Sequence, residues 1–345
     1  MDNELEQFKL ITAARDRVAK ARKEAGVKGI ARSSTSKKIV ALSCGSKNGY
    51  CETFIKAAAM GAEEFGIETE IIRASELTVK PCKACEACVI TFAQGKLARC
   101  PVKDDALWIL EQCILDERAL IVAAPVYHLT SNALLLALTQ RMHPTMFNNL
   151  DKFFNDRKVA GIISNSAGID GWSSFGLTVP HLWVEHFAKV VDQIDIQYRR
   201  QDVDWFERAK QLGRNVAKAM AMPIEQVTYA GEQSRFACPV CHCDVLRMPG
   251  EVPRSPYRGE LRYKLSDVVC PICWVHGNLS RKDGALAVEW DEWDVLHPRF
   301  SEYGVFEHLN VIIENALPGS DLYLPDIANR TLPKKWASYG KYIKP

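Results

Sequence analysis

The stretch Lys38-Ile39-Val40-Ala41-Leu42-Ser43 is a short apolar run, and a run of this kind predicts a buried β-strand. The polar, glycine-containing stretch Cys44-Gly45-Ser46-Lys47-Asn48-Gly49-Tyr50-Cys51 follows it directly. Residues 52–65 predict a helix, Gly66 ends that helix, and residues 68–73 predict a second strand. The order strand, loop, helix, strand is a β–α–β unit, which is typical of parallel sheets.

The same alternation continues along the chain. Apolar runs predict three further strands at residues 119–124, 159–164 and 190–196. Helices are expected from Asp104-Asp105 onward and over residues 134–147, 178–189 and 202–221. Five strands alternating with helices predict an α/β fold built on a doubly wound, five-stranded parallel sheet. Such sheets bind ligands at the loops beyond the carboxyl ends of their strands.

The overall composition is that of a globular protein. The chain has 345 residues, of which 47% are hydrophobic and 25% charged, and this length predicts about two domains. Its net charge of +2 gives no strong attraction to nucleic acid or to a membrane. No apolar run approaches the ~20 residues of a membrane helix, and the first residues contain no apolar segment of a secretory signal. We therefore expect a cytoplasmic protein that binds neither membrane nor nucleic acid.

The cysteines indicate metal rather than disulfides, because most of the twelve sit in C-x-x-C spacings. The stretch Pro81-Cys82-Lys83-Ala84-Cys85-Glu86-Ala87-Cys88 is followed by Cys100-Pro101. This is the thiolate pattern of a [4Fe–4S] cluster, with Cys82, Cys85, Cys88 and Cys100 as the ligands. A tetrahedral zinc site and a reduced, metal-free group of cysteines are the two alternatives.

A second group of cysteines lies after Met222-Pro223, where the composition shifts. Two knuckles, Cys238-Pro239-Val240-Cys241 and Cys270-Pro271-Ile272-Cys273, predict four thiolates around one tetrahedral metal ion. The sequence does not distinguish Zn2+ from a single Fe, since both accept four sulfur ligands. Zinc would be a structural staple, whereas iron would make the module an electron relay. Alternative ligands to one of the thiolates are His242, Cys243 and His276.

These features divide the chain into three expected segments. Residues 1–37 form an N-terminal helical extension, with a charged amphipathic helix over residues 3–27. Residues 38–223 form the α/β domain, with the iron–sulfur insertion at residues 81–101. Residues 224–345 form a small metal-binding domain with an aromatic tail.

The α/β part of the chain, roughly residues 38–222, resembles the flavodoxin-like NAD(P)H-dependent FMN reductases. Ser43 to Cys51 is similar to their phosphate loop, and Ala124-Pro125-Val126-Tyr127 is similar to their flavin-ring loop. The cysteine run, with Cys100-Pro101-Val102-Lys103-Asp104-Asp105, resembles the iron–sulfur flavoproteins of that superfamily. Two features depart from the family pattern: the gap from Cys88 to Cys100 is long, and Cys51 stands where the family commonly has threonine. The last module is similar to a zinc ribbon or a rubredoxin site.

The resemblance implies bound FMN, with its phosphate on the loop that starts the first helix and its ring between two later loops. The residues that it assigns to FMN are Ser43, Ser46, Lys47, Asn48, Gly49, Tyr50, Cys51, Pro125, Val126, Tyr127, His128, Asn165, Ser166, Ala167 and Gly168. His128 is also the candidate catalytic residue, because an imidazole can pass a proton near neutral pH. Candidates for the lining of a substrate pocket are Trp172, His181, Trp183 and His186; helix core plus surface polar groups is the alternative, and for Trp183 helix core is the favoured interpretation.

The function expected from these features is an FMN-dependent oxidoreductase with a [4Fe–4S] cluster. It would pass electrons from NAD(P)H or ferredoxin to an organic or protein acceptor. The alternative is an electron-carrier or redox-sensing iron–sulfur flavoprotein without its own substrate. The partners are then a small molecule or a redox protein, with ferredoxin as one candidate. The resemblance also implies a homodimer or homotetramer.

Overall fold

The structure is a computed structural model. It describes residues 37–116, 119–150, 157–168, 171–197, 203–248 and 266–302, together with a few isolated positions outside these ranges. The expected helix at residues 3–27 lies almost entirely outside the described residues. An expected strand at residues 257–265 and most of the aromatic tail lie outside them as well. The boundaries of the three expected segments therefore stay a prediction.

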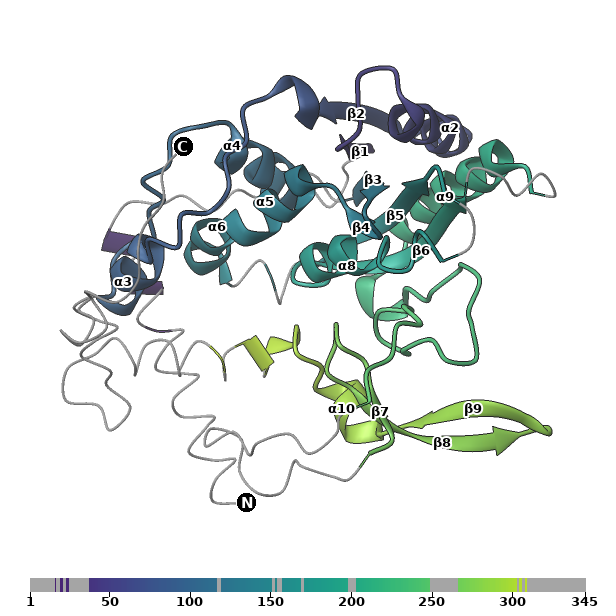
Figure 1. The fold of residues 1–345 in the computed structure, drawn as a ribbon. Helices are drawn as coiled ribbons and strands as arrows, with labels where there is room; N and C mark the ends of the chain where they lie inside the picture. The colour runs from purple at the N-terminus through teal and green to yellow at the C-terminus, as the bar shows by residue number, and fades with distance from the viewer. Residues whose placement is uncertain are drawn as a thin grey trace, which may run out of the picture.

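The main domain is built around a parallel sheet with the strand order β2-β1-β3-β5-β6 (Figure 1). The parallel strands are β1 (Lys38–Ser43), β2 (Glu68–Arg73), β3 (Ala119–Tyr127), β5 (Lys158–Ser166) and β6 (Ala188–Gln197). A short sixth strand, β4 (Thr130–Ser131), pairs antiparallel with the end of β3. The interior strand β1 is buried after its first residue, as expected for a strand covered on both faces.

Helices cover both faces of the sheet (Figure 1). One face carries α2 (Tyr50–Glu63) and α9 (Trp205–Met220). The other face carries α4 (Ala106–Glu111), α5 (Ala133–Arg141), α6 (His143–Asn148) and α8 (Thr178–Val184). Shorter segments are α3 (Ala87–Ala93), a π-helix (Gln112–Asp116) and two 3-10 turns (Ala74–Glu76 and Ile224–Gln226).

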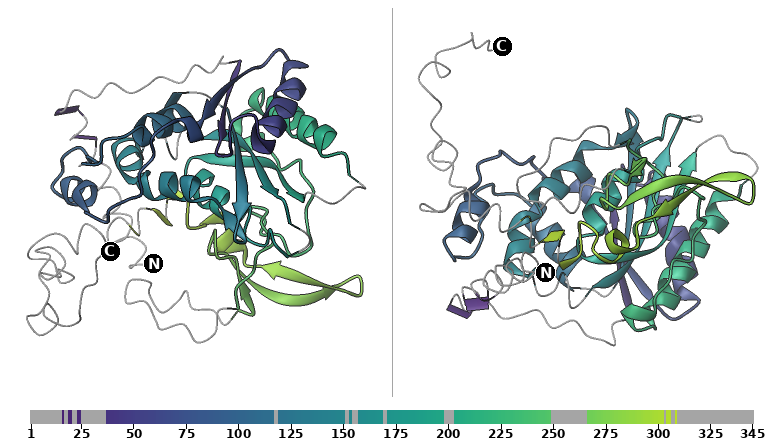
Figure 2. Two further views of the ribbon diagram at one scale, coloured as in Figure 1. Left: turned by 45° about the horizontal axis from the view of Figure 1, so that its top comes forward. Right: turned by 90° about the horizontal axis from the view of Figure 1, so that it is seen from below.

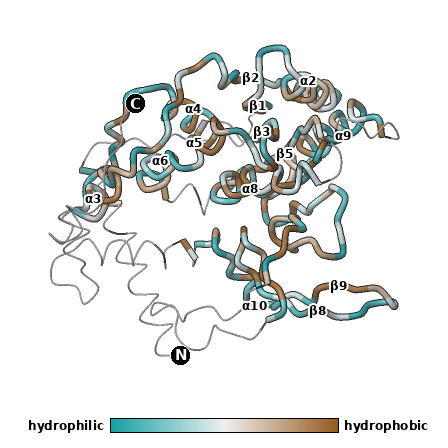
Figure 3. Tube along the Cα trace, viewed as in Figure 1, coloured by the Kyte–Doolittle hydropathy of each residue, from teal (hydrophilic) through white to brown (hydrophobic). Residues whose placement is uncertain are grey.

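Two separate cores fill the spaces between the sheet and its helices. Alternate residues of β1 supply them: Ile39 and Ala41 face α2 and α9, whereas Val40 and Leu42 face the opposite layer. Figure 3 shows apolar residues concentrated along the central strands and the helices that cover them. The doubly wound architecture expected from the apolar runs is confirmed.

The second domain lies beyond β6, which is the edge strand of the sheet (Figure 1). It contains an antiparallel sheet of β7 (Val268–Val269), β8 (His276–Lys282) and β9 (Ala285–Trp290), followed by α10 (Glu292–Leu296). The β8–β9 hairpin projects from the rest of the molecule (Figure 2). Three hydrogen bonds join this part of the chain to β6 among the described residues: Ala230 N–H donates to the Val191 carbonyl at 2.7 Å, Gln193 Nε2 to the His242 carbonyl at 2.6 Å, and Lys189 Nζ to the Val227 carbonyl.

Several element bounds differ from expectation. The helix expected over residues 134–147 is two helices, and it breaks at Met142, before Pro144 in the first turn of α6. The helix expected over residues 178–189 ends at Val184, and β6 begins at Ala188. The strand expected to end at Ala124 runs on to Tyr127, because β4 pairs with its last residues. Among the described residues, none of the helices has the length and apolar character needed to cross a membrane.

Candidate functional site

The loop after β1 is the expected phosphate loop, and its geometry suits an anion. Helix α2 begins at Tyr50, and its N-cap Gly49 makes no side-chain capping bond. The positive end of the helix dipole is thus available to a phosphate. The Ser43 hydroxyl at the end of β1 is buried and has no hydrogen-bond partner among the described residues. A buried orphan hydroxyl beside an uncapped helix fits a phosphate group. A Cβ on Gly49 would lie 2.5 Å from Ser46 Oγ, so the loop requires glycine there.

Cys51 does not replace the hydroxyl of the family's threonine. Its side chain is buried in the first turn of α2, and burial raises the pKa of the thiol to about 12. The thiol is therefore neutral and packs against Gly45, where a Cβ would lie 2.9 Å from Cys51 Cβ. Backbone N–H groups and Ser43 remain the donors that suit a phosphate.

Glu52 in α2 and Arg73 at the end of β2 hold this loop, and neither was predicted from the sequence. The Glu52 side chain is 1% exposed and accepts two bonds from Arg73 at 2.9 Å and a third from Asn48 N–H at 3.0 Å. Lys56 lies 2.8 Å from the same carboxylate. Hydrogen bonds from Arg73 and Lys56 hold the pKa of Glu52 well below its usual range. Through Asn48 N–H, this carboxylate holds the backbone of the loop in place.

The loops after β3 and β5 meet at the same edge of the sheet. After Tyr127 the chain turns through His128 and Leu129, which both have positive φ, at 50° and 71°. Leu129 accepts a bond of 2.9 Å from Phe175 N–H, which ties the two loops together. Asn132 Nδ2 donates to the Cys44 carbonyl at 2.7 Å, so the phosphate loop is joined to the same assembly.

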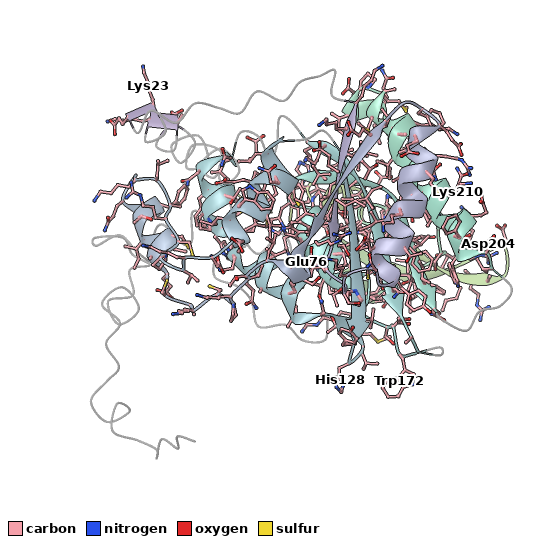
Figure 4. All side chains as sticks on the ribbon, turned by 90° about the horizontal axis from the view of Figure 1, so that it is seen from above. Lys23, Glu76, His128, Trp172, Asp204 and Lys210 are labelled. Carbon is pink, nitrogen blue, oxygen red and sulfur yellow. The ribbon has the colours of Figure 1, made fainter. Side chains whose placement is uncertain are left out.

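Aromatic side chains stand exposed at this edge. Tyr127 is 64% exposed, Trp172 is 59% exposed and Phe175 is 46% exposed. Figure 4 shows the side chains of His128 and Trp172 pointing outward from one edge of the molecule. Beneath them, the hydroxyls of Ser164 and Ser166 are buried without partners among the described residues. The structure thus brings the expected ring-binding stretches, 125–128 and 165–168, to one edge.

Three of the four expected pocket residues lie elsewhere. His181 and Trp183 are 0% exposed inside α8, and His186 follows that helix. His181 bonds to Glu185 at 3.3 Å and to Gln193. Burial lowers the pKa of His186 to about 3, and its ring packs against Phe300. The expectation of a pocket lining is wrong for His181, which is buried in α8, and for His186, whose ring packs against Phe300. Trp183 lies in the core, which was the favoured interpretation for this residue, and Trp172 alone reaches the edge.

The first cysteine run forms a closed loop. Its two ends are paired: Thr78 N–H donates to Asp105 Oδ2 at 2.8 Å, and Asp105 N–H donates to the Thr78 carbonyl at 2.9 Å. Inside the loop, Ala84 and Glu86 have positive φ, at 49° and 54°, which makes the chain wrap tightly.

The thiols of this loop differ in exposure. Cys82 is exposed, whereas Cys85, Cys88 and Cys100 are partly exposed. Burial raises the pKa of the Cys88 thiol, and the charges of Cys100 and Cys82 add to the rise. Among the described residues, these four sulfurs are not gathered within 4.8 Å of one another.

The second group of cysteines forms a compact tetrahedral site. The sulfurs of Cys238, Cys241, Cys270 and Cys273 all lie within 4.8 Å of one another. Cys241 Sγ and Cys270 Sγ are 3.7 Å apart, which matches a tetrahedral ion with metal–sulfur bonds of about 2.3 Å. Hydrogen bonds from the three other thiols hold the pKa of Cys270 below its usual value. The donor set fits zinc or iron.

The two knuckles have the same geometry. His242 N–H donates to the Cys238 carbonyl and Trp274 N–H to the Cys270 carbonyl, each at 2.8 Å. His242 and Trp274 both have left-handed backbones, with φ of 60° and 61°. The expected substitutes for a thiolate are not needed, because His276 bonds to Asp294 at 2.7 Å and the four-cysteine set is complete without Cys243.

Comparison with known proteins agrees with this geometry. A family model described as NADPH-dependent FMN reductase matches residues 37–194. An iron–sulfur flavoprotein of Methanosarcina thermophila is 31% identical over 141 residues, which are 41% of this chain and 69% of that protein. A solved flavone reductase superposes with a TM-score of 0.62 and 20% identity, over 89% of this chain and 99% of that one. The structural likeness supports the fold.

Proposed function

The chain belongs to the NADPH-dependent FMN reductase family and is a flavin-dependent oxidoreductase, and on this basis we propose that it also holds a [4Fe–4S] cluster. The cluster would be bound by Cys82, Cys85, Cys88 and Cys100. Electrons would pass from NAD(P)H or ferredoxin to an organic or protein acceptor. The observation that carries the proposal is the closed cysteine loop, whose paired ends and wrapped backbone hold four thiols in one region.

FMN would be held by the cradle after β1 and the edge formed by the loops after β3 and β5. The phosphate would take the N-terminal end of α2 and the Ser43 hydroxyl. When bound, the flavin supplies both hydride and single-electron transfer. His128 would stand beside the acceptor and could pass a proton, and the exposed rings of Tyr127 and Trp172 would suit a planar aromatic acceptor.

The second metal site would hold zinc as a structural ion. Its position supports this assignment, because the flavin loops follow β1, β3 and β5, whereas the module is joined to the edge strand β6. Lys189, near the start of β6 and thus at the opposite end of the strands, donates to the Val227 carbonyl in the segment that leads to the module. All four thiols are 0% exposed. A site buried there would stabilise the edge of the sheet rather than relay electrons.

Anaerobic purification followed by metal, sulfide and flavin analysis of one sample tests the proposal. We expect about four iron and four sulfide per chain, with about one FMN and one zinc. A pair of variants then separates the two sites. Cys85→Ala should remove the iron–sulfur absorbance and leave the zinc content unchanged. Cys241→Ser should lower the zinc content and leave the sulfide content unchanged. Two zinc ions with no sulfide and no flavin would contradict the proposal.

A further inference from the structure

The base of the cysteine loop encloses a buried cation. Arg141, in the last turn of α5, has a side chain that is 1% exposed, and it points between the two ends of the loop. It donates to the Lys80 carbonyl at 2.9 Å and to the Val102 carbonyl at 3.3 Å. These carbonyls lie two residues before Cys82 and two residues after Cys100. One guanidinium therefore holds both ends of the insertion.

Asp104 is the counter-charge of this cation. Its carboxylate is 0% exposed and makes two bonds with Arg141, at 2.6 and 2.9 Å. It also accepts a bond from Lys80 N–H at 2.7 Å. The pair is thus bidentate and removed from water, which is the geometry in which an arginine fork is most effective.

The Nε–H group of the guanidinium is the donor not used in these bonds. Among the described residues, Arg141 Nε is buried and has no hydrogen-bond partner. The guanidinium bonds to the Val102 carbonyl, two residues after Cys100, so its charge lies against the segment that carries this sulfur. A buried N–H without a partner is a donor that a ligand sulfur can accept.

We propose that Arg141 is a positioning residue that fixes the loop and sets the reduction potential of the cluster through the sulfur of Cys100. The inference rests on the proposed function, since it requires the cluster. Gain of one electron makes a four-thiolate cluster more negative, and no proton needs to move with it. A fixed cation against one ligand sulfur stabilises the reduced state more than the oxidised state, so it raises the potential.

The experiment is an EPR-monitored redox titration of the full-length, anaerobically purified protein, with dithionite as the reductant. Asp104→Asn leaves the cation without its counter-charge, so the potential should rise. The double variant Arg141→Met/Asp104→Asn removes both charges and the donor, so the potential should fall below that of the parent. We expect about a tenfold change in the one-electron equilibrium constant each way, which is about 59 mV. Arg208→Met/Asp192→Asn, a buried bidentate pair between α9 and β6, is the matched control and should leave the potential unchanged.

The opposite shifts expected for the two variants distinguish an electrostatic effect of Arg141 on the reduction potential from a purely structural role. Both variants disturb the same hydrogen bonds at the base of the loop, so a purely structural clamp would shift the two potentials in one direction or not at all. Either of these results overturns the inference. If the double variant loses its cluster, Asp104→Asn still tests the inference: an unchanged or lower potential overturns it, since neutralising Asp104 leaves the Arg141 charge uncompensated. A parent protein without any cluster would overturn the proposed function and the inference together, whereas an unresponsive cluster would overturn the inference alone.

Discussion

At the scale of single residues, the anion-binding loop depends on one buried carboxylate. Glu52 holds Asn48 N–H and the Arg73 fork, and all these bonds need its negative charge. Glu52→Gln should lower the free energy of unfolding at pH 7 by about 1–3 kcal/mol, because it leaves buried donors poorly paired. The pKa of Glu52 is depressed in the folded state, so this stability is present above the unfolded value of about 4.3 and is lost as the pH falls. Urea unfolding at pH 7 and below pH 4 should therefore show the difference between parent and variant shrinking in acid.

Glu64→Gln is the control for this prediction. Glu64 follows the last turn of α2 and pairs with Arg214, but its side chain is 45% exposed. Solvent screens such a pair, so the variant should unfold almost as the parent does. Equal losses of unfolding free energy in Glu52→Gln and Glu64→Gln would contradict a special contribution of the buried Glu52 carboxylate.

At the scale of elements, α2 and α9 pack backbone against backbone. A Cβ on Gly213 would lie 1.8 Å from the Ala58 carbonyl oxygen, and a Cβ on Gly61 would lie 2.0 Å from the Lys210 carbonyl oxygen. Gly213→Ala would force the helices apart, since backbone atoms cannot turn aside as a side chain can. We expect a loss of about 1–3 kcal/mol in the free energy of unfolding, with weaker FMN binding because α2 carries the phosphate loop. Urea unfolding and fluorescence titration with FMN would measure both.

Lys218→Ala, at an exposed position of the same helix α9, is the matched control. A surface change of this kind should alter stability by less than about 0.5 kcal/mol and leave FMN affinity unchanged. A Gly213→Ala protein with the stability of the parent would contradict the close approach of the two helices.

At the scale of the whole molecule, the second domain protects an open sheet edge. An uncovered edge strand offers unpaired N–H and C=O groups to other chains, and the bonds of Ala230 and Gln193 cover part of β6. Small domains of this kind gain folding free energy from their metal. In Cys241→Ser, amide hydrogen exchange should therefore speed up in the second domain and in β6, while β1 and β3 keep the protection of the parent. Unchanged exchange in β6 would show that the edge does not depend on the metal.

The sequence predicted the order of elements well, because buried parallel strands are apolar runs and their spacing sets the topology. From local spacing it also identified the four cysteines of the second group, which the structure brings together, whereas the four of the first group stay a prediction. It missed the two ion pairs that shape the sites, because their partners are distant in the chain. Arg73 lies 21 residues from Glu52, and Arg141 lies 37 residues from Asp104. Nothing in the local pattern marks such pairs. The inward turn of His181 and Trp183 was likewise decided by how α8 packs.

The paired ends of the cysteine loop have a consequence for how such a protein can arise. Thr78 and Asp105 bind each other through main chain and side chain, so the segment between them leaves the sheet and returns to the same place. Lengthening an insertion between paired ends costs little closure entropy, about 0.6 kcal/mol for each doubling of its length. A lineage can therefore acquire or discard residues 81–101 as one piece, exchanging the segment for a short turn while the parallel sheet keeps its strand order. The α/β fold and the cysteine segment are in this sense separable: the sheet does not depend on the segment, and the segment needs only a place where two chain ends already meet.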